Sequence, residues 1–453
     1  MTSADLLSTN QAGIDLRTSA LAAREAARQL AATPGEVRDA GLQAIAAALI
    51  SERDAILAAN AEDLAAAQQL AAQGELGEPL VARLNLAKGK YERAIEMVES
   101  VQSAPDPLWQ TLRATEIDGG LNLFRVSVPI GVLGVIFESR PDALIQIAAV
   151  CLKSGNAVLM KGGSEAARSN RVLADLITRA TASVPGLPPD WLTLMESRED
   201  VKQMLAQDDA IDLIIPRGSN EFVRYIMDNT NIPVTGHADG VCHVYVDKDA
   251  DLDKAVRVAV DSKIQDVSTC CAAETLLVHV DVAEAFLQRA IAELEQAKVL
   301  VRGDDRTRAI AGVEHVEAAT EQDWSTEYLD YILSVKVVDS LSEAMTHINR
   351  YGSAHTDTIV TEDRAHAVRF LQGVDACSAL VNASTRFADG YRYGLGAEVG
   401  ISTGRLHSRG PVGMEGLTTY KYLLEGDGQT VDDYEGVTPK PYTHRPLKQR
   451  WEA

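Results

Sequence analysis

Two adjacent cysteines offer the most reactive chemistry in the chain. Cys270 and Cys271 lie in DVSTCCAAETLLVH at 266–279, between a Ser-Thr pair and an apolar run typical of a strand. If Ser268 or Thr269 caps a short helix starting at the cysteines, a thiol there has a lowered pKa and more nucleophilic thiolate. Backbone N–H groups at a helix start could also stabilise an oxyanion. Only one of the two side chains can face a given cleft, and the pattern alone favours neither.

The other three cysteines are interpreted as core residues. Cys151, Cys242 and Cys377 each lie in an apolar stretch, and free cysteine is among the most buried residue types. An odd total of five cysteines over 453 residues is typical of a reduced, cytosolic protein and not of a disulfide framework. No pair has the CxxC spacing of a zinc site, so we expect no metal.

Two glycine-containing turns could hold an anion. LMKGGSEAARSN at 159–170 passes from a strand through Lys161 and two glycines into a helix, which offers backbone N–H groups and a positive charge. IIPRGSNEFVRYI at 214–226 repeats the scheme with Gly218 and Ser219. Neither turn is a G-x-G-x-x-G fingerprint or a P-loop. The pair leaves a dinucleotide site and plain capped turns as equal alternatives.

Alternating strands and helices must position these turns. Strand-like runs near 127–138, 156–163, 212–218 and 242–247 alternate with helical patterns, and a second series of alternations follows the cysteines. Such alternation predicts the α/β class, with two doubly wound units whose mostly parallel sheets are covered by helices on both faces. Ligands of such sheets bind at the strand ends, where loops run into helices.

The remaining segments carry no chemistry of their own. Residues 1–104 are Ala-rich and show the periodicity of amphipathic helices. The stretch 113–128 predicts a hairpin with a Gly-Gly turn. A helix is expected after the cysteine stretch, with Asp281 as its N-cap. The tail from about 411 is rich in Gly, Pro and Tyr, and we expect it to pack on another surface, such as that of a neighbouring subunit.

Composition excludes several classes of function. The formal net charge is −22 and the sequence pI is near 4.8, so nucleic-acid binding is disfavoured. The longest apolar runs, such as PIGVLGVIF, are too short to span a membrane. The first residues lack a basic stretch followed by an apolar one, so no signal peptide is expected. We therefore expect a cytoplasmic protein.

Several longer segments resemble one known family. The chain is similar to the gamma-glutamyl phosphate reductases (glutamate-5-semialdehyde dehydrogenases), a branch of the aldehyde dehydrogenase superfamily, from about residue 10 to 445. The run His-Ile-x-x-Tyr-Gly-Ser-x-His-Thr-Asp at 347–357 is a specific signature of this branch. The other segments that carry the resemblance are VPIGVLGVIFESRPDALIQIAAVCLKSGNAVLMKGGSEAARSN, STCCAAETLLVH, NASTRFADGYRYGLGAEVGIST and LHSRGPVGMEGLTTYKY.

The resemblance selects one of the two thiols. The family nucleophile follows Ser-Thr in a pattern like S-T-C-N-x-x-E-T-L-L-V, which implies that Cys270 is the nucleophile. Cys271 stands where an Asn is expected, so the hydrogen bonding of this neighbour departs from the family pattern. Relatives that hydrolyse carry a general-base Glu before the strand that precedes the cysteine, whereas IPVTGHADGVCHVYV at 232–246 contains no Glu.

The resemblance also implies cofactor-binding residues. Lys161 matches the lysine that holds the adenosine ribose. Ser164 stands where NAD-preferring relatives carry a Glu, which fits NADP(H). Gly218 and Ser219 match the turn at the pyrophosphate, and Glu327 resembles the glutamate that holds the nicotinamide ribose.

The implied reaction is the NADPH-dependent reduction of glutamyl 5-phosphate through a Cys270 thioester, with oxyanion donors from the Cys270 backbone and the 137–141 loop. Another thiol-dependent aldehyde dehydrogenase, such as a coenzyme A-acylating one, and a non-catalytic assembly partner are the alternatives. A homo-oligomer is expected, and a glutamate 5-kinase is a channelling partner to consider. Candidates for binding the phosphoryl group or the substrate carboxylate, with surface salt bridging as the alternative, are Arg140, Asn382, Arg386 and Arg409.

The expected domains follow the same resemblance. Residues 1–115 and 127–240 are expected to form the NADP(H)-binding domain and 241–410 the catalytic domain. An oligomerisation hairpin and tail are expected at 116–126 and 411–453.

Overall fold

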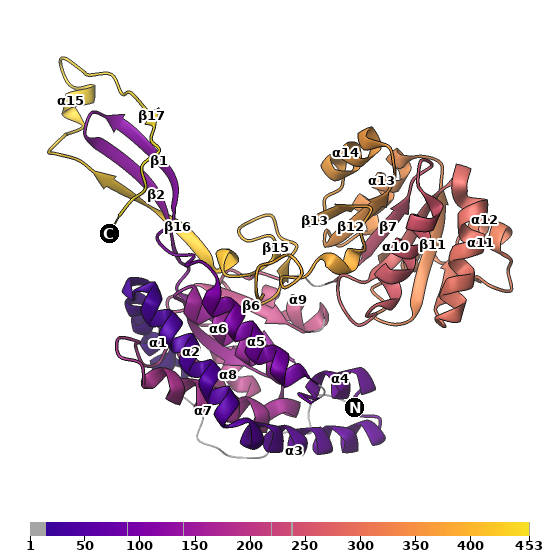
Figure 1. Cartoon of the computed structure of the whole chain (residues 1–453), viewed down its shortest axis with the longest axis horizontal. Coiled ribbons are helices and arrows are strands. Elements are labelled where there is room, and N and C mark those ends of the chain that lie inside the picture. Colours follow the sequence, from indigo (N-terminus) through magenta and orange to yellow (C-terminus); the bar gives the residue numbers. More distant parts are fainter. Residues whose placement is uncertain (1–14, 88, 139, 219, 237–238, 453) are drawn as a thin grey trace. The chain divides into compact units, whose positions relative to one another are not determined.

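The chain folds into two compact units (Figure 1). The computed structural model describes residues 15–87, 89–138, 140–218, 220–236 and 239–452. The first unit comprises Met1–Gly218, Ile226–Val234 and Leu417–Ala453, and the second comprises Ser219–Tyr225 and Thr235–Gly416.

A four-stranded parallel sheet lies at the centre of the first unit. Its order is β5-β4-β3-β6, with bounds Leu192–Met195, Ala157–Lys161, Val132–Phe137 and Leu213–Arg217. All six residues of β3 are buried, as expected for a parallel strand covered on both faces. Helices α1 and α6 contact β4, and α7 contacts β5. The predicted doubly wound arrangement is therefore confirmed for this unit.

The Ala-rich start of the chain forms the predicted helices. The buried side chain of Asn60 connects α3 to the end of α4. Its Nδ2 donates to the Leu84 carbonyl oxygen at 2.9 Å, and its Oδ1 accepts from the Leu86 N–H at 2.9 Å. The Ala-rich start contains α1 (Leu16–Ala32), α2 (Gly35–Ser51), α3 (Arg53–Ala72), α4 (Glu78–Leu84) and α5 (Lys90–Ser103). The helices that follow are α6 (Pro141–Lys153), α7 (Ala167–Ala182), α8 (Arg198–Leu205) and α9 (Asn220–Asp228).

A second, antiparallel sheet in the first unit has the order β16-β2-β1-β17. Strands β1 (Thr111–Asp118) and β2 (Leu121–Pro129) form the predicted hairpin, and Gly120 adopts a φ of +78° in its turn. The tail does not remain irregular, because β16 (Thr418–Glu425) pairs with β2 along its whole length and β17 (Arg445–Pro446) pairs with β1. Short α15 (Asp432–Glu435) lies between these two strands in the sequence.

The second unit contains a seven-stranded parallel sheet. Its order is β10-β9-β11-β8-β7-β12-β13, with bounds Glu317–Ala318, Leu300–Gly303, Ile332–Val338, Ala273–His279, Cys242–Val246, Thr356–Val360 and Ser378–Val381. Its helices are α10 (Leu252–Ile264), α11 (Val280–Gln296), α12 (Asp305–Ala311), α13 (Leu341–Tyr351) and α14 (Arg364–Gly373). Short segments complete the list: η1 (Ser164–Ala166), η2 (Glu321–Ser325), η3 (Thr385–Phe387), η4 (Glu415–Leu417), β14 (Ile401–Ser402) and β15 (Gly410–Pro411).

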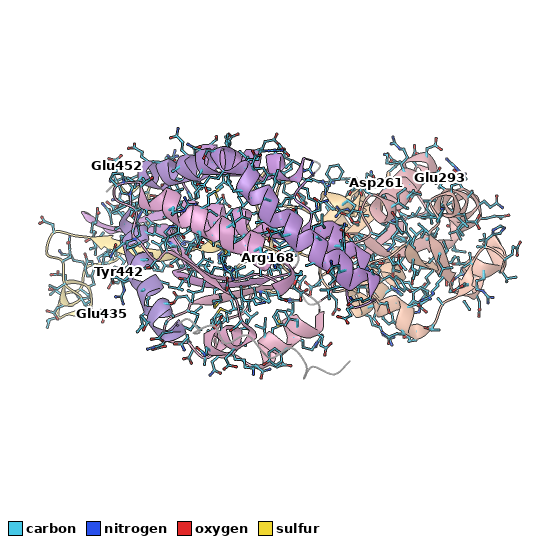
Figure 2. All side chains as sticks on the ribbon, turned by 90° about the horizontal axis from the view of Figure 1, so that it is seen from below. Arg168, Asp261, Glu293, Glu435, Tyr442 and Glu452 are labelled. Carbon is cyan, nitrogen blue, oxygen red and sulfur yellow. The ribbon has the colours of Figure 1, made fainter. Side chains whose placement is uncertain are left out.

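Both faces of this sheet are buried. Val244 and Val246 of β7 belong to a core with residues of α10 and α11, whereas the intervening Tyr245 belongs to a core with residues of α13 and α14. This alternation follows from the two-residue period of a strand. The outer helix faces carry charge, as shown by Asp261 of α10 and Glu293 of α11 (Figure 2).

Two local predictions are wrong. Cys270 and Cys271 lie in a turn that leads directly into β8, and no helix begins at them. Because β8 extends to His279, helix α11 starts at once at Val280, and its N-cap is His279 instead of Asp281. The Nδ1 atom of His279 accepts the Asp281 N–H at 3.2 Å. In the described part of the chain, no helix is long and apolar enough to cross a membrane.

Candidate active site

The turn that carries Cys270 is held by hydrogen bonds within itself. Oδ1 of Asp266 accepts from the Ser268 N–H at 3.1 Å and from its hydroxyl at 2.7 Å. The Ala272 N–H donates to the Thr269 carbonyl oxygen at 3.0 Å. Cys270 is half-buried, whereas Cys271 is only 3 % exposed. The turn therefore offers one thiol to a ligand and buries the other.

The backbone of Cys270 is enclosed by β7 and the residues before it. The thiol of Cys242 donates to the Cys270 carbonyl oxygen at 3.2 Å, and burial raises the pKa of Cys242, so this thiol keeps its proton. A Cβ on Gly240 would lie 2.2 Å from the same carbonyl oxygen and 2.6 Å from Oε1 of Glu327. Gly240 thus allows Cys270 and Glu327, two of the predicted site residues, to approach each other.

A buried arginine reaches the second thiol. Arg386 of η3 is 6 % exposed; its Nε donates to Oε1 of Gln265 at 2.9 Å, and its Nη1 donates to the Sγ atom of Cys271. Burial raises the pKa of the Cys271 thiol, although the positive charge of Arg386 opposes that shift. Cys271 is therefore a neutral thiol at neutral pH.

A buried ion pair lies at the start of β8. Nζ of Lys263 is 2.6 Å from Oε2 of Glu274, and both side chains are fully buried. Oε1 of Glu274 also accepts from the Leu329 N–H at 3.2 Å. Burial raises the pKa of Glu274 to about 7 and lowers the pKa of Lys263, because the low-dielectric interior disfavours both charged forms. Glu274 thus joins α10 to β8 and to the segment that follows Glu327.

The cofactor candidates of the first unit lie at the carboxyl edge of its parallel sheet. Lys161 ends β4 beside Ile136 of β3, and Gly218 follows β6. A Cβ on Gly218 would lie 3.0 Å from the carboxyl carbon of Glu138. Ser164 is exposed at the first position of η1, and Ser219 lies outside the described residues.

The residues at this edge fit a dinucleotide. A Cβ on Gly162 would lie 2.1 Å from Nδ2 of the buried Asn170, so the turn needs glycine there. Oδ1 of Asn170 is buried and makes no hydrogen bond within the described residues, which leaves an acceptor available beside the turn. With the cation of Lys161, the edge offers a positive charge, a hydrogen-bond acceptor and accessible backbone.

The other three substrate-binding candidates have protein partners. Arg140 pairs with Asp142 at 3.2 Å, and Arg409 pairs with Asp375 at 2.7 Å. Asn382 accepts from the Thr361 N–H at 3.0 Å and donates to its carbonyl oxygen at 2.9 Å, so the amide joins the ends of β12 and β13. Among the hydrogen bonds of the described residues, that of Arg386 joins one of the four candidates to the cysteine turn.

Sequence reasoning missed the residues that hold this turn. Cys242 was assigned to the core, and it is buried, but its thiol bonds to the Cys270 carbonyl across a separation of 28 positions. Lys263 and Gln265 gave only a weak signal: Lys263 lies among the buried positions of an otherwise apolar helix face.

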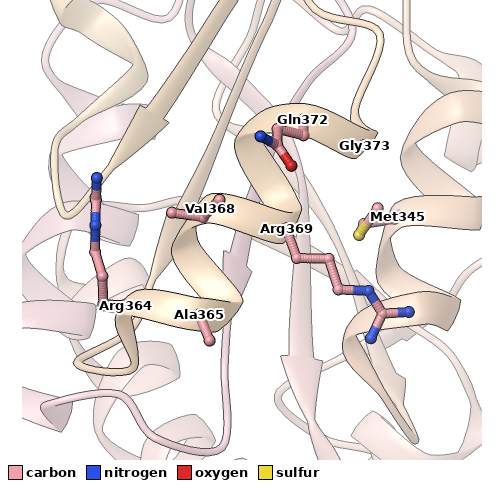
Figure 3. Close-up of a pocket in the computed structure, with 7 residues that line it drawn as sticks. All are labelled: Met345, Arg364, Ala365, Val368, Arg369, Gln372 and Gly373. Carbon is pink, nitrogen blue, oxygen red and sulfur yellow. The ribbon is translucent and has the colours of Figure 1, made fainter.

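A separate groove of 710 Å³ lies along α14 (Figure 3). It is lined by Met345 of α13 and by residues of α14 from Arg364 to Gly373. None of the candidate site residues lines it, so its size gives no support for a role in the chemistry at Cys270.

Known proteins share this architecture and this sequence. Residues 8–330 match the model of the aldehyde dehydrogenase family. Two doubly wound α/β units are the arrangement expected of that class, and the chain belongs to the aldehyde dehydrogenase family.

Within that class, the similarity is to one branch. A gamma-glutamyl phosphate reductase of Natronomonas pharaonis is 54% identical over 430 residues, which cover 95% of this chain and 97% of the relative. One of Haloquadratum walsbyi is 55% identical over 91% of each chain. The crystal structure of a gamma-glutamyl phosphate reductase of Thermotoga maritima has a TM-score of 0.87 and 39% identity, covering 92% of this chain and 99% of that one. The chain is a member of the gamma-glutamyl phosphate reductase branch.

Proposed function

We propose that the chain reduces L-glutamyl 5-phosphate to L-glutamate 5-semialdehyde and phosphate with NADPH, the second step of proline biosynthesis from glutamate. The observation that carries this proposal is the similarity to gamma-glutamyl phosphate reductases along nearly the whole chain. The half-buried Cys270, held in a turn beside Glu327, supports it independently.

Cys270 acts as the nucleophile. Its thiolate attacks the carbonyl carbon of the acyl phosphate, a carbon–sulfur bond forms, and the carbon–oxygen bond to phosphate breaks, which leaves a thioester. The Cys270 backbone N–H donates a hydrogen bond to the oxyanion. Cys242 donates a hydrogen bond to the Cys270 carbonyl oxygen, and Gly240 leaves room for this carbonyl. These contacts keep the Cys270 thiol in one orientation during the attack.

Lys161, Ser164, Gly218, Ser219 and Glu327 would hold the cofactor. NADPH, when bound, would supply the hydride for the thioester carbonyl carbon. The carbon–sulfur bond then breaks, which releases the aldehyde and returns the Cys270 thiolate. The neutral Ser164 is compatible with a 2′-phosphate, and Lys161 offers it a positive charge. Residues 232–246 contain no Glu to activate water, which favours reduction over hydrolysis of the thioester.

The exposed edge of the antiparallel sheet is the basis for a proposed homo-oligomer. Strand β16 lies at its edge and exposes Tyr420, Tyr422 and Leu424. An open edge with apolar side chains is a ready surface for another chain, so we propose a homo-oligomer formed through the hairpin and tail. A glutamate 5-kinase that hands over the unstable acyl phosphate is proposed as a further partner.

The reverse reaction tests the function. Purified protein is given glutamate 5-semialdehyde and NADP⁺, and NADPH is followed at 340 nm with phosphate, with coenzyme A, or with neither. We expect turnover with phosphate alone and none in Cys270→Ala, while Cys377→Ala serves as a thiol control. Turnover that requires coenzyme A would identify a coenzyme A-acylating enzyme, and no turnover in any mixture would favour an assembly role.

A further inference from the structure

Arg386 is a buried cation without a carboxylate partner. Within the described residues, no carboxylate oxygen lies at ion-pair distance from its guanidinium. The other deeply buried arginine, Arg38, is 1 % exposed and pairs with Asp106 at 2.7 Å. Burying a charge without a counter-charge is costly, and proteins normally pair such groups. Arg386 can therefore take an anionic ligand as a direct partner.

The contacts of the guanidinium leave one nitrogen available. Nε is used by Gln265 and Nη1 by Cys271, whereas Nη2 makes no hydrogen bond within the described residues. Neither partner supplies a negative charge, because Gln265 is an amide and the raised pKa of Cys271 keeps its thiol protonated. The two contacts fix the planar guanidinium and leave Nη2 to bind a ligand.

Two carboxylates, those of Asp389 and Glu398, lie near this site and act electrostatically on Cys271. Asp389 accepts the N–H groups of Tyr391 and Arg392 at 3.0 and 3.1 Å, and Glu398 accepts the Gly390 N–H at 2.9 Å. Nη1 of Arg392 donates to the Arg386 carbonyl oxygen at 2.6 Å, which adds a second positive charge to this loop. Both carboxylates bind backbone N–H groups, so within the described residues neither bonds to the Arg386 guanidinium, and Nη2 stays open to a ligand.

The place of Arg386 relative to the nucleophile indicates which anion. Cys271 follows Cys270 directly, and consecutive Cα atoms are about 3.8 Å apart. In an acyl phosphate, the phosphate is bonded through one bridging oxygen to the carbon that the thiolate attacks. The α-carboxylate lies at the far end of the glutamyl chain, so the phosphoryl group is the anion nearest to the attacked carbon.

We propose that Arg386 binds the phosphoryl group of the substrate through Nη2, with Cys271 and Gln265 as the residues that position its guanidinium. The site takes a tetrahedral oxyanion, and it rests on the function proposed above. On departure, the phosphate carries the electron pair of the broken carbon–oxygen bond, and the cation stabilises the negative charge that develops there.

Phosphate titrations of the reverse reaction test the site. Arg386→Gln is expected to raise the KM for inorganic phosphate about ten- to a hundred-fold, the usual value of a charge-assisted hydrogen bond. The KM for NADP⁺ should not change. Arg386→Lys keeps the positive charge but loses the planar guanidinium, so its KM for phosphate should lie between those of wild type and Arg386→Gln. The matched control is Arg405→Gln, an exposed arginine paired with Asp375, which should behave as wild type.

Cys271 is tested as a positioning residue. Cys271→Ala should raise the KM for phosphate by a few-fold and leave the KM for NADP⁺ unchanged, since the Cys271 sulfur is only a weak acceptor for the guanidinium. Cys271→Asn should restore the wild-type KM, because its amide oxygen can accept from Nη1. A fall in kcat with an unchanged phosphate KM in both Cys271→Ala and Arg386→Gln would mean that these residues are only structural.

A protection assay distinguishes the proposed anion site at Arg386 from the proposed reductase function. Inorganic phosphate should slow the alkylation of Cys270 by iodoacetamide in wild type and not in Arg386→Gln, with the modified cysteine identified by mass spectrometry. Absence of protection in wild type at saturating phosphate overturns the anion site, whatever the variants do. If wild type shows no phosphate-dependent turnover, the proposed function is wrong. If wild type turns over but phosphate protects Cys270 equally in wild type and in Arg386→Gln, only the role of Arg386 is rejected.

Discussion

The cysteine turn of the second unit and the glycine turn of the first unit are built in different ways. The Cys270 turn is held by buried side chains from separate elements: Cys242 of β7, Arg386 of η3 and the Lys263–Glu274 pair. The turn after β4 is local, with two glycines and an exposed Ser164. A group that forms and breaks a covalent bond needs one fixed orientation, whereas backbone N–H groups at a strand end suffice to hold a phosphate.

This difference predicts where substitutions are tolerated. Changes around Cys270 should damage the rate or the stability, because each contact is buried and has no replacement. A change at the exposed Ser164 after β4 should alter only the choice of cofactor. The expected effects of four substitutions, from large to small, test this contrast.

Gly240→Ala should have the largest effect. The added Cβ would lie 2.2 Å from the Cys270 carbonyl oxygen and 2.7 Å from its Cα atom, and backbone cannot yield as a flexible side chain can. We expect kcat to fall by about a hundred-fold or more, since a misplaced reactive group costs that much. Gly119→Ala, where a Cβ would meet nothing within 4 Å, is the control in the same rate assay. A Gly240→Ala enzyme with normal kcat would show that the turn is not rigid.

Lys263→Met should lower stability most. Removing one partner of a buried ion pair costs about 3–5 kcal/mol, and urea unfolding measures this loss. Lys202→Met, at an exposed pair 3.5 Å from Glu199, should cost less than about 1 kcal/mol. Equal losses in the two variants would remove the contrast between buried and surface pairs.

The same variant should show a pH dependence. The pKa of Glu274 is raised to about 7 in the wild-type fold, and without Lys263 it should rise further, so the folded variant holds a proton that the unfolded chain releases. A carboxyl with a raised folded pKa gives more stability at low pH, and this contribution is lost as the pH rises through that pKa. Lys263→Met should therefore be more stable at pH 6 than at pH 8, and the double variant Lys263→Met with Glu274→Leu should lose this dependence.

Ser164→Glu should change the cofactor without changing the fold. A carboxylate at this exposed position would repel a 2′-phosphate, and we expect the preference for NADPH over NADH to fall about ten-fold, equivalent to about 1.4 kcal/mol. The ratio of kcat/KM for the two cofactors measures it. Ser183→Glu, at the other end of α7, is the matched control. An unchanged ratio would mean that Ser164 does not face the 2′ position.

Cys242→Ala should have the smallest effect. It removes one weak hydrogen bond to the Cys270 carbonyl, worth about 1 kcal/mol, so kcat should fall about five-fold. Cys242→Ser keeps a donor and should recover part of the rate. The rate of Cys270 alkylation against pH reports the same orientation, and identical profiles in the three proteins would exclude a role for this bond.

The sequence indicated the elements better than it indicated their contacts. Alternating apolar runs and helical periods were enough to predict both parallel sheets, and the Gly-Gly pair was enough to predict the hairpin turn. The predicted helix at the cysteines failed because β8 begins at Ala273 and takes up the residues that such a helix would need. The tail looked irregular because β16 is an exposed edge strand, with little of the apolar alternation of a core strand.

The residues of the candidate site also fall into those that the sequence indicated and those that only the tertiary structure brought together. Residue types and the family pattern alone pointed to Cys270, Lys161 and Gly218, since a reactive thiol and glycine turns are local features. Only the tertiary structure brought Cys242, Arg386 and Gly240 to Cys270 and its neighbour. Arg386 and Cys271 are 115 positions apart, and their contact depends on how the chain returns to β8 after β13. Local periodicity fixes which residues form a strand, but the order of strands in the sheet decides which buried groups meet.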